Sequence, residues 1–408
     1  MKKIVIFVSL IILCFNIRAE AVPLPKVTAQ GGILLDLNSG KILLEKNSHN
    51  RYAPASTTKI MTALLTFEKC KLSDKVIVGK APPFEDGSKI YVLEGEELTV
   101  EQLLYALLLP SANDAALALA EHISGSKEAF AKLMNARAKE LGCKDTNFLN
   151  PNGLFNKNHY TSAYDLSIIA SKAMEIPKFR QIISTLSYNI LPTNKQVKTR
   201  YLHNENKLLF GRGYKYPGAD GVKTGYTIKS KHTYVGSATR NGRTLLVVFL
   251  YDDKVFYKES ASLFNYGFNN FNDIKILSKN VIVKNINIKG SNEDIPVYPE
   301  KDLSFTIPNG IKPAINKKIV IKNSLTKVTM GEVIGYIEVT SPGNNKAVLN
   351  LISGVNYSTP IYNIIPKANG LVKRIFRLSN VKYLLFCIIL IFFGRGFYRK
   401  YKRKRKLF

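Results

Sequence analysis

The hydrophobic pattern of this chain changes near residue 274, and this change constrains the fold more than any other feature. Before it, stretches with helical spacing of apolar residues mix with β-like runs. After it, short alternating segments such as NVIVKNINI and KKIVIKN are separated by Asn, Gly and Pro. A chain of 408 residues is long enough for two folded units with accessory segments. We therefore expect an α+β domain at residues 22–273, followed by an all-β domain at residues 274–366.

Local patterns predict the elements of the first domain. The run GGILLDLNSGKILLEKN places two β-like segments around Asn38-Ser39-Gly40, which predicts a hairpin. A second hairpin is predicted where Asn241-Gly242 joins residues 232–238 to residues 243–251, because Asn-Gly suits a two-residue turn between antiparallel strands. Apolar residues at helical spacing predict helices at residues 56–69, 99–109, 113–123, 128–141 and 254–268.

The N-terminal segment has the pattern of a secretory signal. Lys2 and Lys3 precede an apolar stretch at residues 4–15, and Ala19-Glu20-Ala21 places small residues at a cleavage position. We expect a signal peptide at residues 1–21. An uncleaved anchor is the alternative, although this apolar run is short for a bilayer span.

The C-terminal segment combines an apolar run with a basic tail. The last fourteen residues carry eight Lys or Arg and no acid. We expect a basic linker at residues 367–382, a membrane anchor at residues 383–394 and a basic tail at residues 395–408. Whether this anchor spans the bilayer or lies in its interface is open. In both cases the folded body is expected on the extracytoplasmic side of a bacterial cell membrane.

The charge of the chain bears on its partners. The formal net charge is +29 at pH 7, and much of it lies in the tail next to the expected anchor. Such a chain concentrates near anionic envelope polymers or lipid headgroups. Nucleic acid is the other class of partner for a basic chain, but the secretory signal argues against it, so no nucleic-acid partner is expected.

Cysteine and histidine spacing gives no sign of a metal centre. Cys14 and Cys387 fall in the terminal segments, which leaves Cys70 and Cys143 in the exported body, where their pairing is open. The five histidines are scattered, with no pair at i and i+4. We expect no metal and no cofactor.

The stretch PASTTKIMTA places Ser56 and Lys59 three residues apart at a predicted helix start. Alone this pair is weak, since a helix cap and a solvated lysine look the same. Its functional interpretation is physical: free backbone N–H groups at a helix start stabilise an oxyanion. A buried lysine near another cation loses its proton and acts as a base toward the hydroxyl.

Two further motifs strengthen this interpretation. LPSANDAAL supplies Ser111-x-Asn113, and GADGVKTGYT supplies Lys223-Thr224-Gly225. The order S-x-x-K, S-x-N, K-T-G is the signature of penicillin-recognising serine enzymes. With it, the chain resembles the low-molecular-mass penicillin-binding proteins, specifically the serine-type D-alanyl-D-alanine carboxypeptidases.

The resemblance covers nearly the whole chain. It includes NPNGL at residues 150–154, HNENKLL at residues 203–209, the β-rich part and the expected anchor. It implies a β-lactamase/transpeptidase-like catalytic domain, in which an antiparallel sheet carries helices and a helical subdomain. A small all-β sandwich domain is expected to follow.

The resemblance also implies catalytic roles. Ser56 attacks the penultimate D-alanine carbonyl and is acylated, with Lys59 as the base. Ser111 relays protons toward the leaving amine, and the Asn113 side chain holds the substrate backbone.

The resemblance implies further roles for residues of the K-T-G strand. Lys223 raises the local positive potential, and the Thr224 hydroxyl receives the terminal carboxylate. Gly225 lets the strand approach the substrate, because a Cβ atom there would obstruct it. The backbone N–H groups of Ser56 and Tyr226 form the oxyanion hole.

Two departures from the family pattern concern one side of the cleft. Ser230-Lys231 stands where such enzymes usually carry Ala-Gly. Lys258 stands where an arginine often holds the terminal carboxylate, and lysine cannot reproduce the bidentate fork of arginine.

The function expected from the sequence is removal of the terminal D-alanine from peptidoglycan pentapeptides, with β-lactam antibiotics as acylating inhibitors. Two alternatives remain on the same fold. One is a catalytically impaired wall-binding or scaffold protein, and the other is a hydrolase like the β-lactamases, although residues 150–165 offer no glutamate to activate a deacylating water. The oligomeric state is open.

Overall fold

The computed structural model of the protein describes residues 23–287, 294–322, 325, 327–341 and 345–358. It divides the chain into one compact unit of Met1–Ile274 with Thr306–Ile311, and another of Lys275–Phe305 with Lys312–Phe408. The expected signal peptide, anchor and basic tail lie outside the described residues. None of the described helices is long and apolar enough to cross a membrane.

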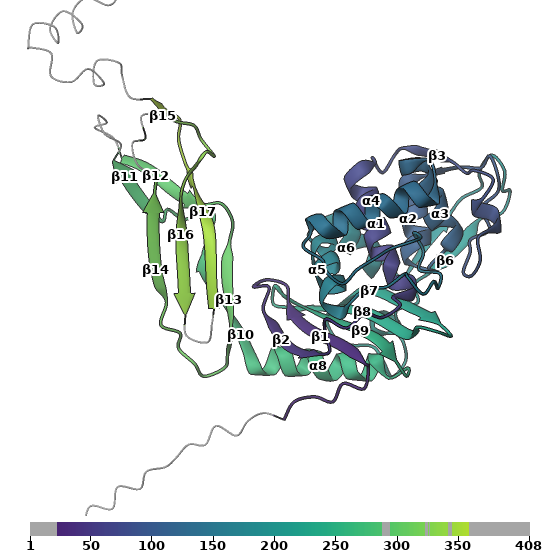
Figure 1. The fold of residues 1–408 in the computed structure, drawn as a ribbon, viewed down its shortest axis with the longest axis horizontal. Coiled ribbons are helices and arrows are strands. Elements are labelled where there is room, and N and C mark those ends of the chain that lie inside the picture. Colours follow the sequence, from purple (N-terminus) through teal and green to yellow (C-terminus); the bar gives the residue numbers. More distant parts are fainter. Residues whose placement is uncertain (1–22, 288–293, 323–324, 326, 342–344, 359–408) are drawn as a thin grey trace, which may run out of the picture. The chain divides into compact units, whose positions relative to one another are not determined.

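A five-stranded antiparallel sheet organises the first unit (Figure 1). Its strands, in spatial order, are β2 (Ile42–Lys46), β1 (Gly31–Asp36), β9 (Arg243–Asp252), β8 (Lys231–Arg240) and β7 (Ala219–Thr227). Two short two-strand pairings also lie in this unit: β3 (Lys75–Ile77) with β4 (Glu97–Thr99), and β5 (Ser187–Ile190) with β6 (Arg200–His203).

Both predicted hairpins are confirmed. The turn between β1 and β2 contains Gly40 at φ 74°, and the turn between β8 and β9 contains Asn241 at φ 51° and Gly242 at φ 78°. Two successive positive φ angles are what a tight hairpin turn of primed type requires, and Asn-Gly adopts them at low cost. Local sequence therefore sets the connection between the two longest strands.

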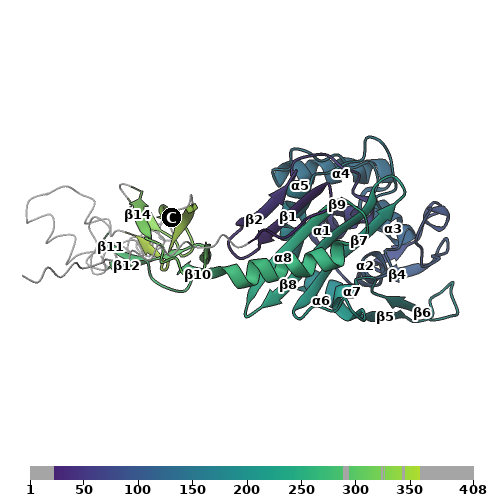
Figure 2. The same ribbon diagram turned by 90° about the horizontal axis from the view of Figure 1, so that it is seen from below.

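The helices of this unit cover both faces of the sheet. Helices α1 to α6 lie on one side and α8 runs along the other (Figures 1 and 2). Their bounds are α1 Lys59–Lys69, α2 Val100–Leu108, α3 Asn113–Ser124, α4 Lys127–Glu140, α5 Ala163–Met174, α6 Pro177–Ser184, α7 Lys207–Phe210 and α8 Phe256–Asn270.

Strand β9 connects the two hydrophobic cores. Leu246 and Val248 belong to the core shared with α1 to α6, whereas Val247 and Phe249 belong to the core that includes Phe264 of α8. Successive side chains of a strand point to opposite faces, so a continuous apolar run predicts a strand covered on both sides. The entire strand is buried apart from Tyr251.

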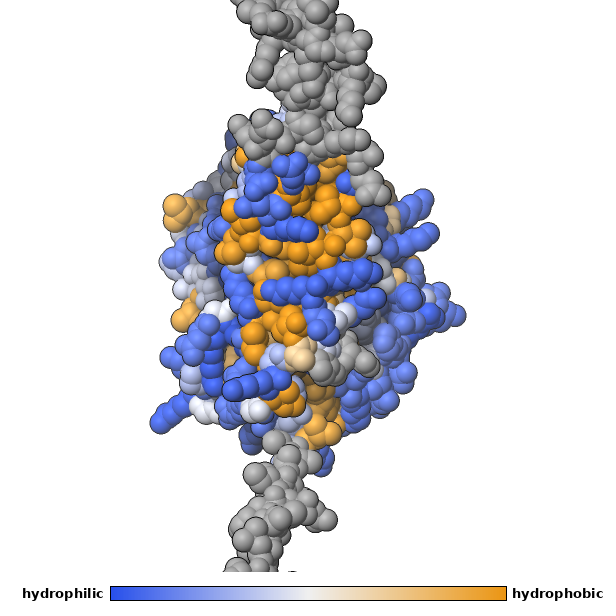
Figure 3. Space-filling view, turned by 90° about the vertical axis from the view of Figure 1, so that its left-hand side faces the viewer, coloured by the Kyte–Doolittle hydropathy of each residue, from blue (hydrophilic) through white to orange (hydrophobic). Residues whose placement is uncertain are grey.

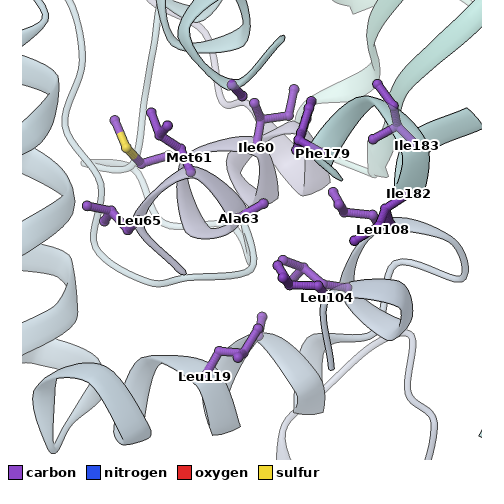
Figure 4. Close-up of a cluster of buried hydrophobic side chains, with 14 of the residues drawn as sticks. Ile60, Met61, Ala63, Leu65, Leu104, Leu108, Leu119, Phe179, Ile182 and Ile183 are labelled. Carbon is purple, nitrogen blue, oxygen red and sulfur yellow. The ribbon is translucent and has the colours of Figure 1, made fainter. Parts of the chain in front are cut away.

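Helix α1 passes through the larger core. Its residues Ile60, Met61 and Leu65 belong to this core together with Leu104 of α2 and Phe179 of α6, and Ile60 lies beside Phe179 (Figure 4). A helix that is apolar nearly all round is buried in this way. The burial fixes the position of Lys59, the first residue of α1.

The predicted helices are present, with one local correction. We expected a helix over residues 56–69, but Ser56 lies in a separate 3₁₀ turn, Ala55–Thr58, and α1 begins at Lys59. Ala55 has φ 47°, a left-handed conformation that is uncommon for a residue other than glycine. The 3₁₀ turn tightens the spacing between the hydroxyl and the lysine.

The second unit contains only strands in its described part, which confirms the expected all-β domain. Its main sheet has the order β11 (Lys284–Asn287), β12 (Asp294–Pro299), β17 (Asn345–Ser353), β16 (Val333–Ser341) and β14 (Asn316–Ile321). Two further pairings are β15 (Lys327–Val328) with β18 (Tyr357–Ser358), and β10 (Phe271–Leu277) with β13 (Leu303–Pro308), whose residues are divided between the two units. Figure 3 shows apolar surface interrupted by hydrophilic side chains on one face of the molecule.

Candidate active site

The 3₁₀ turn that carries Ser56 is held between the sheet and the helices. The Thr57 hydroxyl donates to the Pro54 carbonyl at 2.6 Å, and the Thr233 hydroxyl of β8 donates to the same carbonyl at 2.7 Å. Gly153, at φ 88°, approaches from another side, where a Cβ atom would overlap the Ala55 carbonyl. Ser56 is therefore fixed at the start of α1 while its side chain stays half-buried.

Lys59 is the most enclosed polar group of the site, with 0% of its surface exposed. Its Nζ atom donates to Ser56 Oγ at 3.0 Å, to Asn113 Oδ1 at 2.6 Å and to the Asn152 carbonyl at 2.9 Å. Three acceptors exhaust the donors of an ammonium group. The Asn152 carbonyl was not anticipated from the sequence, although it lies in the NPNGL stretch that carries the resemblance.

The surroundings of Lys59 favour its neutral form. Burial lowers its pKa well below the usual value for lysine, and the positive charge of Lys223 lowers it further. Glu205 opposes this shift. A lysine whose pKa is depressed by desolvation and a neighbouring cation can accept a proton from the hydroxyl that it contacts.

Ser111 and Asn113 lie at the start of α3. Ser111 has φ 65°, is 4% exposed, and its Oγ atom has no hydrogen-bond partner among the described residues. A strained backbone and an unpaired buried hydroxyl are both unfavourable, and they are retained where a bound group uses them. Asn113 is fixed through its amide, which donates to the Asp86 carbonyl at 2.5 Å.

The K-T-G segment occupies the middle of the edge strand β7. Lys223 is 2% exposed, its Nζ atom donates to the Thr224 carbonyl at 3.1 Å, and burial lowers its pKa. A Cβ atom on Gly225 would lie 2.8 Å from the backbone nitrogen of Ser56 and 2.4 Å from Thr233 Oγ1. Only glycine permits this approach of the strand to the serine turn.

These segments surround a cavity of about 460 Å³. Its lining includes five residues that the motifs predicted and that the structure brings together: Ser56, Ser111, Thr224, Gly225 and Tyr226. Lys59 and Lys223 lie behind this surface, since both are almost fully buried.

Lys258 is placed differently from the motif residues. It is exposed on α8 and is not among the residues that line the cavity. The cation that lines this cavity from the same region is Lys254, just before α8, at φ 75°. The family resemblance pointed to Lys258 by its position in the sequence, but Lys254, four residues earlier in the loop before α8, is the lysine that lines the cavity.

A carboxylate also lines the cavity. Glu205 Oε2 accepts a hydrogen bond from Thr224 Oγ1 at 3.2 Å and lies 3.9 Å from Lys223 Nζ. Sequence reasoning did not identify it as a site residue, because Glu205 and Thr224 are brought together by the path of the chain between β6 and β7.

The Ser230-Lys231 departure falls in the turn from β7 to β8. The Ser230 hydroxyl lies 2.6 Å from the Thr227 hydroxyl and 3.1 Å from the Thr227 backbone nitrogen, so it closes the turn. Lys231 has φ 53°, which glycine adopts without strain and lysine does not. The strand pairing next to Gly225 is kept despite the substitution.

Three side chains outside the cavity carry atoms that could bind a metal ion, and these atoms lie close together. The ligand atoms of Cys70, Asp74 and His122 all fall within 4.8 Å of one another. None of the three lines the cavity of Ser56. Cys70 and Cys143 are both free thiols, which answers the question of their pairing.

The arrangement is suited to acyl transfer. It presents the hydroxyl of Ser56 with an amine of lowered pKa, Lys59, at hydrogen-bond distance, and the unpaired hydroxyl of Ser111 in the same cavity. It also presents a strand edge with the backbone of Tyr226 beside the serine turn.

Comparisons with known proteins agree with this chemistry. A family model described as D-alanyl-D-alanine carboxypeptidase matches residues 18–254. A second model, described as penicillin-binding protein 5, C-terminal domain, matches residues 271–358.

Individual relatives match over most of the chain. D-alanyl-D-alanine carboxypeptidase DacF of Bacillus subtilis is 35% identical over 77% of this chain and 82% of its own length. D-alanyl-D-alanine carboxypeptidase DacA of Haemophilus influenzae is 31% identical over 83% of this chain and 88% of its own.

Among solved structures, penicillin-binding protein 5 of Haemophilus influenzae superposes with a TM-score of 0.68 at 30% identity, covering 83% of this chain and 100% of that one. The predicted α+β fold with a following β domain is confirmed by this likeness.

Proposed function

This chain belongs to the D-alanyl-D-alanine carboxypeptidase family, and on that premise we propose that Ser56 is the nucleophile of a serine carboxypeptidase acting on peptidoglycan stem peptides. The reaction removes the terminal D-alanine through an acyl-enzyme. β-Lactam antibiotics acylate the same serine.

The single observation that supports this mechanism best is the environment of Lys59. Its amine is fully buried, its pKa is lowered, and its Nζ atom lies 3.0 Å from Ser56 Oγ. A neutral amine at this distance takes the hydroxyl proton as the oxygen attacks the carbonyl carbon of the penultimate D-alanine.

During acylation, groups held in place by the fold stabilise the charges that develop and transfer the proton. The carbonyl oxygen becomes an oxyanion, and the backbone N–H groups of Ser56 and Tyr226 stabilise it. The C–N bond breaks, and the leaving amine takes a proton that Lys59 received and Ser111 passes on. The unpaired Ser111 hydroxyl in the cavity supports this relay.

Water completes the cycle. Lys59, neutral again, accepts a proton from a water molecule that attacks the acyl-enzyme, and Ser56 leaves with its proton restored. Asn113 holds the Lys59 amine through its Oδ1 atom throughout. Lys223 and Thr224 receive the carboxylate of the departing residue. Lys254, which lines the cavity, is the second cation in place of Lys258.

We further propose that the protein works on the outer side of a bacterial cell membrane. The expected signal peptide at residues 1–21 and anchor at residues 383–394 support export and retention. Peptidoglycan stem peptides are found on that side of the membrane.

A direct test measures release of free D-alanine from a peptide that ends in D-Ala-D-Ala. The wild-type protein is expected to release D-alanine, and Ser56→Ala is expected to reduce the rate to background. Release that persists in a folded Ser56→Ala variant would contradict the assignment of the nucleophile. A folded wild-type protein that releases none would contradict the carboxypeptidase activity.

A further inference from the structure

Glu205 is an acidic residue in the part of the cavity that receives the leaving residue. Its backbone is held on both sides: Asn204 Oδ1 accepts from the Asn206 backbone nitrogen at 2.9 Å, and the Tyr257 hydroxyl donates to the Glu205 carbonyl at 3.1 Å. Asn206 in turn donates to the Gly221 carbonyl of β7 at 2.7 Å. The Glu205 side chain therefore extends from a fixed backbone toward the K-T-G strand.

The Glu205 carboxylate occupies the hydrogen bond that a terminal carboxylate would use. Thr224 Oγ1 donates to Glu205 Oε2 at 3.2 Å. A hydroxyl has one proton to donate, so it cannot donate at the same time to Glu205 and to a substrate carboxylate. A terminal carboxylate at this position would also lie beside a like charge.

The charges around Glu205 are of both signs. Lys223 Nζ lies 3.9 Å away, while Lys207 and Lys254 also line the cavity. The Lys207 amine lies 6.0 Å from the centre of the Tyr214 ring, which places it over an aromatic face. The cavity thus offers lysine ammonium groups that can bind a carboxylate. It also offers one carboxylate, Glu205 beside Thr224, that can bind an ammonium group.

We propose that Glu205 determines the charge of the leaving residue that this site accepts. It disfavours a leaving residue whose only charge is its carboxylate. It favours one that is neutral, or that carries an ammonium group beside the carboxylate. This inference rests on the proposed function of the same site.

Exposure of the Glu205 side chain to solvent limits its effect on kcat/KM. About half of the Glu205 side chain is exposed, at 49%, so water screens its field. A screened contact of this kind changes a rate constant by about tenfold or less. The lysines remain when Glu205 is replaced, so the site keeps its ability to bind a carboxylate.

The experiment uses three peptides that share the acyl part, with D-alanine as the penultimate residue, and differ only in the last residue or its terminus. The first has a free terminal carboxylate, the second is its amide, and the third carries D-2,3-diaminopropionate, which is alanine with an ammonium group on its β-carbon, as the last residue. The specificity constant kcat/KM is measured for each with the full chain and with Glu205→Gln, Glu205→Lys and Glu94→Gln. Glu94 is exposed and does not line the cavity, so its variant controls for the loss of one negative charge.

The expected result is a change of preference that follows the charge at position 205. Glu205→Gln should raise kcat/KM for the carboxylate peptide by about tenfold relative to kcat/KM for the amide, a ratio in which an effect common to both peptides through Lys59 cancels. It should lower kcat/KM for the diaminopropionate peptide, and Glu205→Lys should extend both trends. Glu94→Gln should leave the ratios of kcat/KM between the three peptides unchanged.

Two results for the Glu205 variants would overturn the inference. In one, kcat/KM changes by the same factor for all three peptides; in the other, it changes for none of them. Melting temperatures identify a variant that has unfolded, and the Lys variant provides a second charge step if the Gln variant is uninformative. Failure of the proposed function looks different, because wild-type protein would then neither turn over any of the peptides nor acquire a covalent β-lactam on Ser56. Labelled Ser56 with unchanged ratios overturns only the role of Glu205.

Discussion

The Lys59 amine donates a hydrogen bond to the Ser56 hydroxyl at 3.0 Å, across the junction between a 3₁₀ turn and the start of α1. The lysine has no exposed surface, whereas the serine lines the cavity. A buried amine thus lies directly behind an accessible hydroxyl.

Replacing Lys59 should greatly lower the rate of acylation while the protein stays folded. Lys59→Met keeps the length of the side chain and removes the amine, so Ser56 loses its base. We expect the second-order rate constant for acylation by a fluorescent penicillin to fall by about 10²- to 10⁴-fold. Circular dichroism shows whether the fold is retained. A folded Lys59→Met variant that acylates at the wild-type rate would show that another group is the base.

The pH dependence of acylation should follow Lys59. Because its neutral form is the base, the acylation rate should rise with pH through the lowered Lys59 pKa and then reach a plateau. Lys223→Gln removes a cation that lowers this pKa, so the profile should shift to higher pH. Glu205→Gln removes an anion that raises it, so the profile should shift to lower pH.

Stopped-flow acylation at a series of pH values measures both shifts. Movement of the two variants in the same direction would be inconsistent with electrostatic control of Lys59.

His159 should make stability dependent on pH. Its Nδ1 atom accepts from the Leu149 backbone nitrogen at 3.2 Å, and its Nε2 atom lies 3.0 Å from the Thr58 hydroxyl, beneath the serine turn. Burial lowers the pKa of His159 to about 4, against 6.5 in the unfolded chain. Between these values the unfolded state binds more protons than the folded state, so stability falls as pH decreases from about 6.5 toward 4.

The full loss amounts to roughly 3 kcal/mol, since one pKa unit corresponds to about 1.4 kcal/mol. Urea unfolding at several pH values measures it. His159→Gln should remove most of this dependence, and an unchanged slope in that variant would assign the dependence to other groups.

Lys231 should be a removable source of strain. At φ 53° it adopts a left-handed conformation that costs a non-glycine residue about 1–2 kcal/mol. Lys231→Gly should therefore raise the free energy of unfolding by about 0.5–1 kcal/mol, after the greater freedom of glycine in the unfolded chain is deducted. Lys229→Gly, in the same turn without a positive φ, serves as the control and should be neutral or destabilising. A destabilised Lys231→Gly variant would show that the lysine side chain contributes contacts that outweigh the strain.

The sequence was sufficient to predict elements whose local pattern is strong. The hairpin at Asn241-Gly242 and the helices that became α2, α3 and α4 were predicted within about two residues, because turn chemistry and apolar periodicity act over short distances. Helices α5 and α6 and the short strands β5 and β6 were not predicted.

The candidate site could be predicted only in part, because some of its residues are brought together only by the tertiary fold. Motif spacing brought out Ser56, Lys59 and Ser111, but the hydrogen bond between Glu205 and Thr224 depends on how the chain folds back between β6 and β7. The same holds for Lys254, which lines the cavity while Lys258 faces outward. Tertiary proximity of this kind leaves no periodic signature.

The measurement that tests the central claim most directly is the mass of the intact protein after brief incubation with benzylpenicillin, followed by peptide mapping. The account predicts one covalent adduct with the mass of the antibiotic, located on Ser56, absent in Ser56→Ala and strongly reduced in Lys59→Met. An adduct on a different residue, or a folded wild-type protein that acquires none, would contradict it.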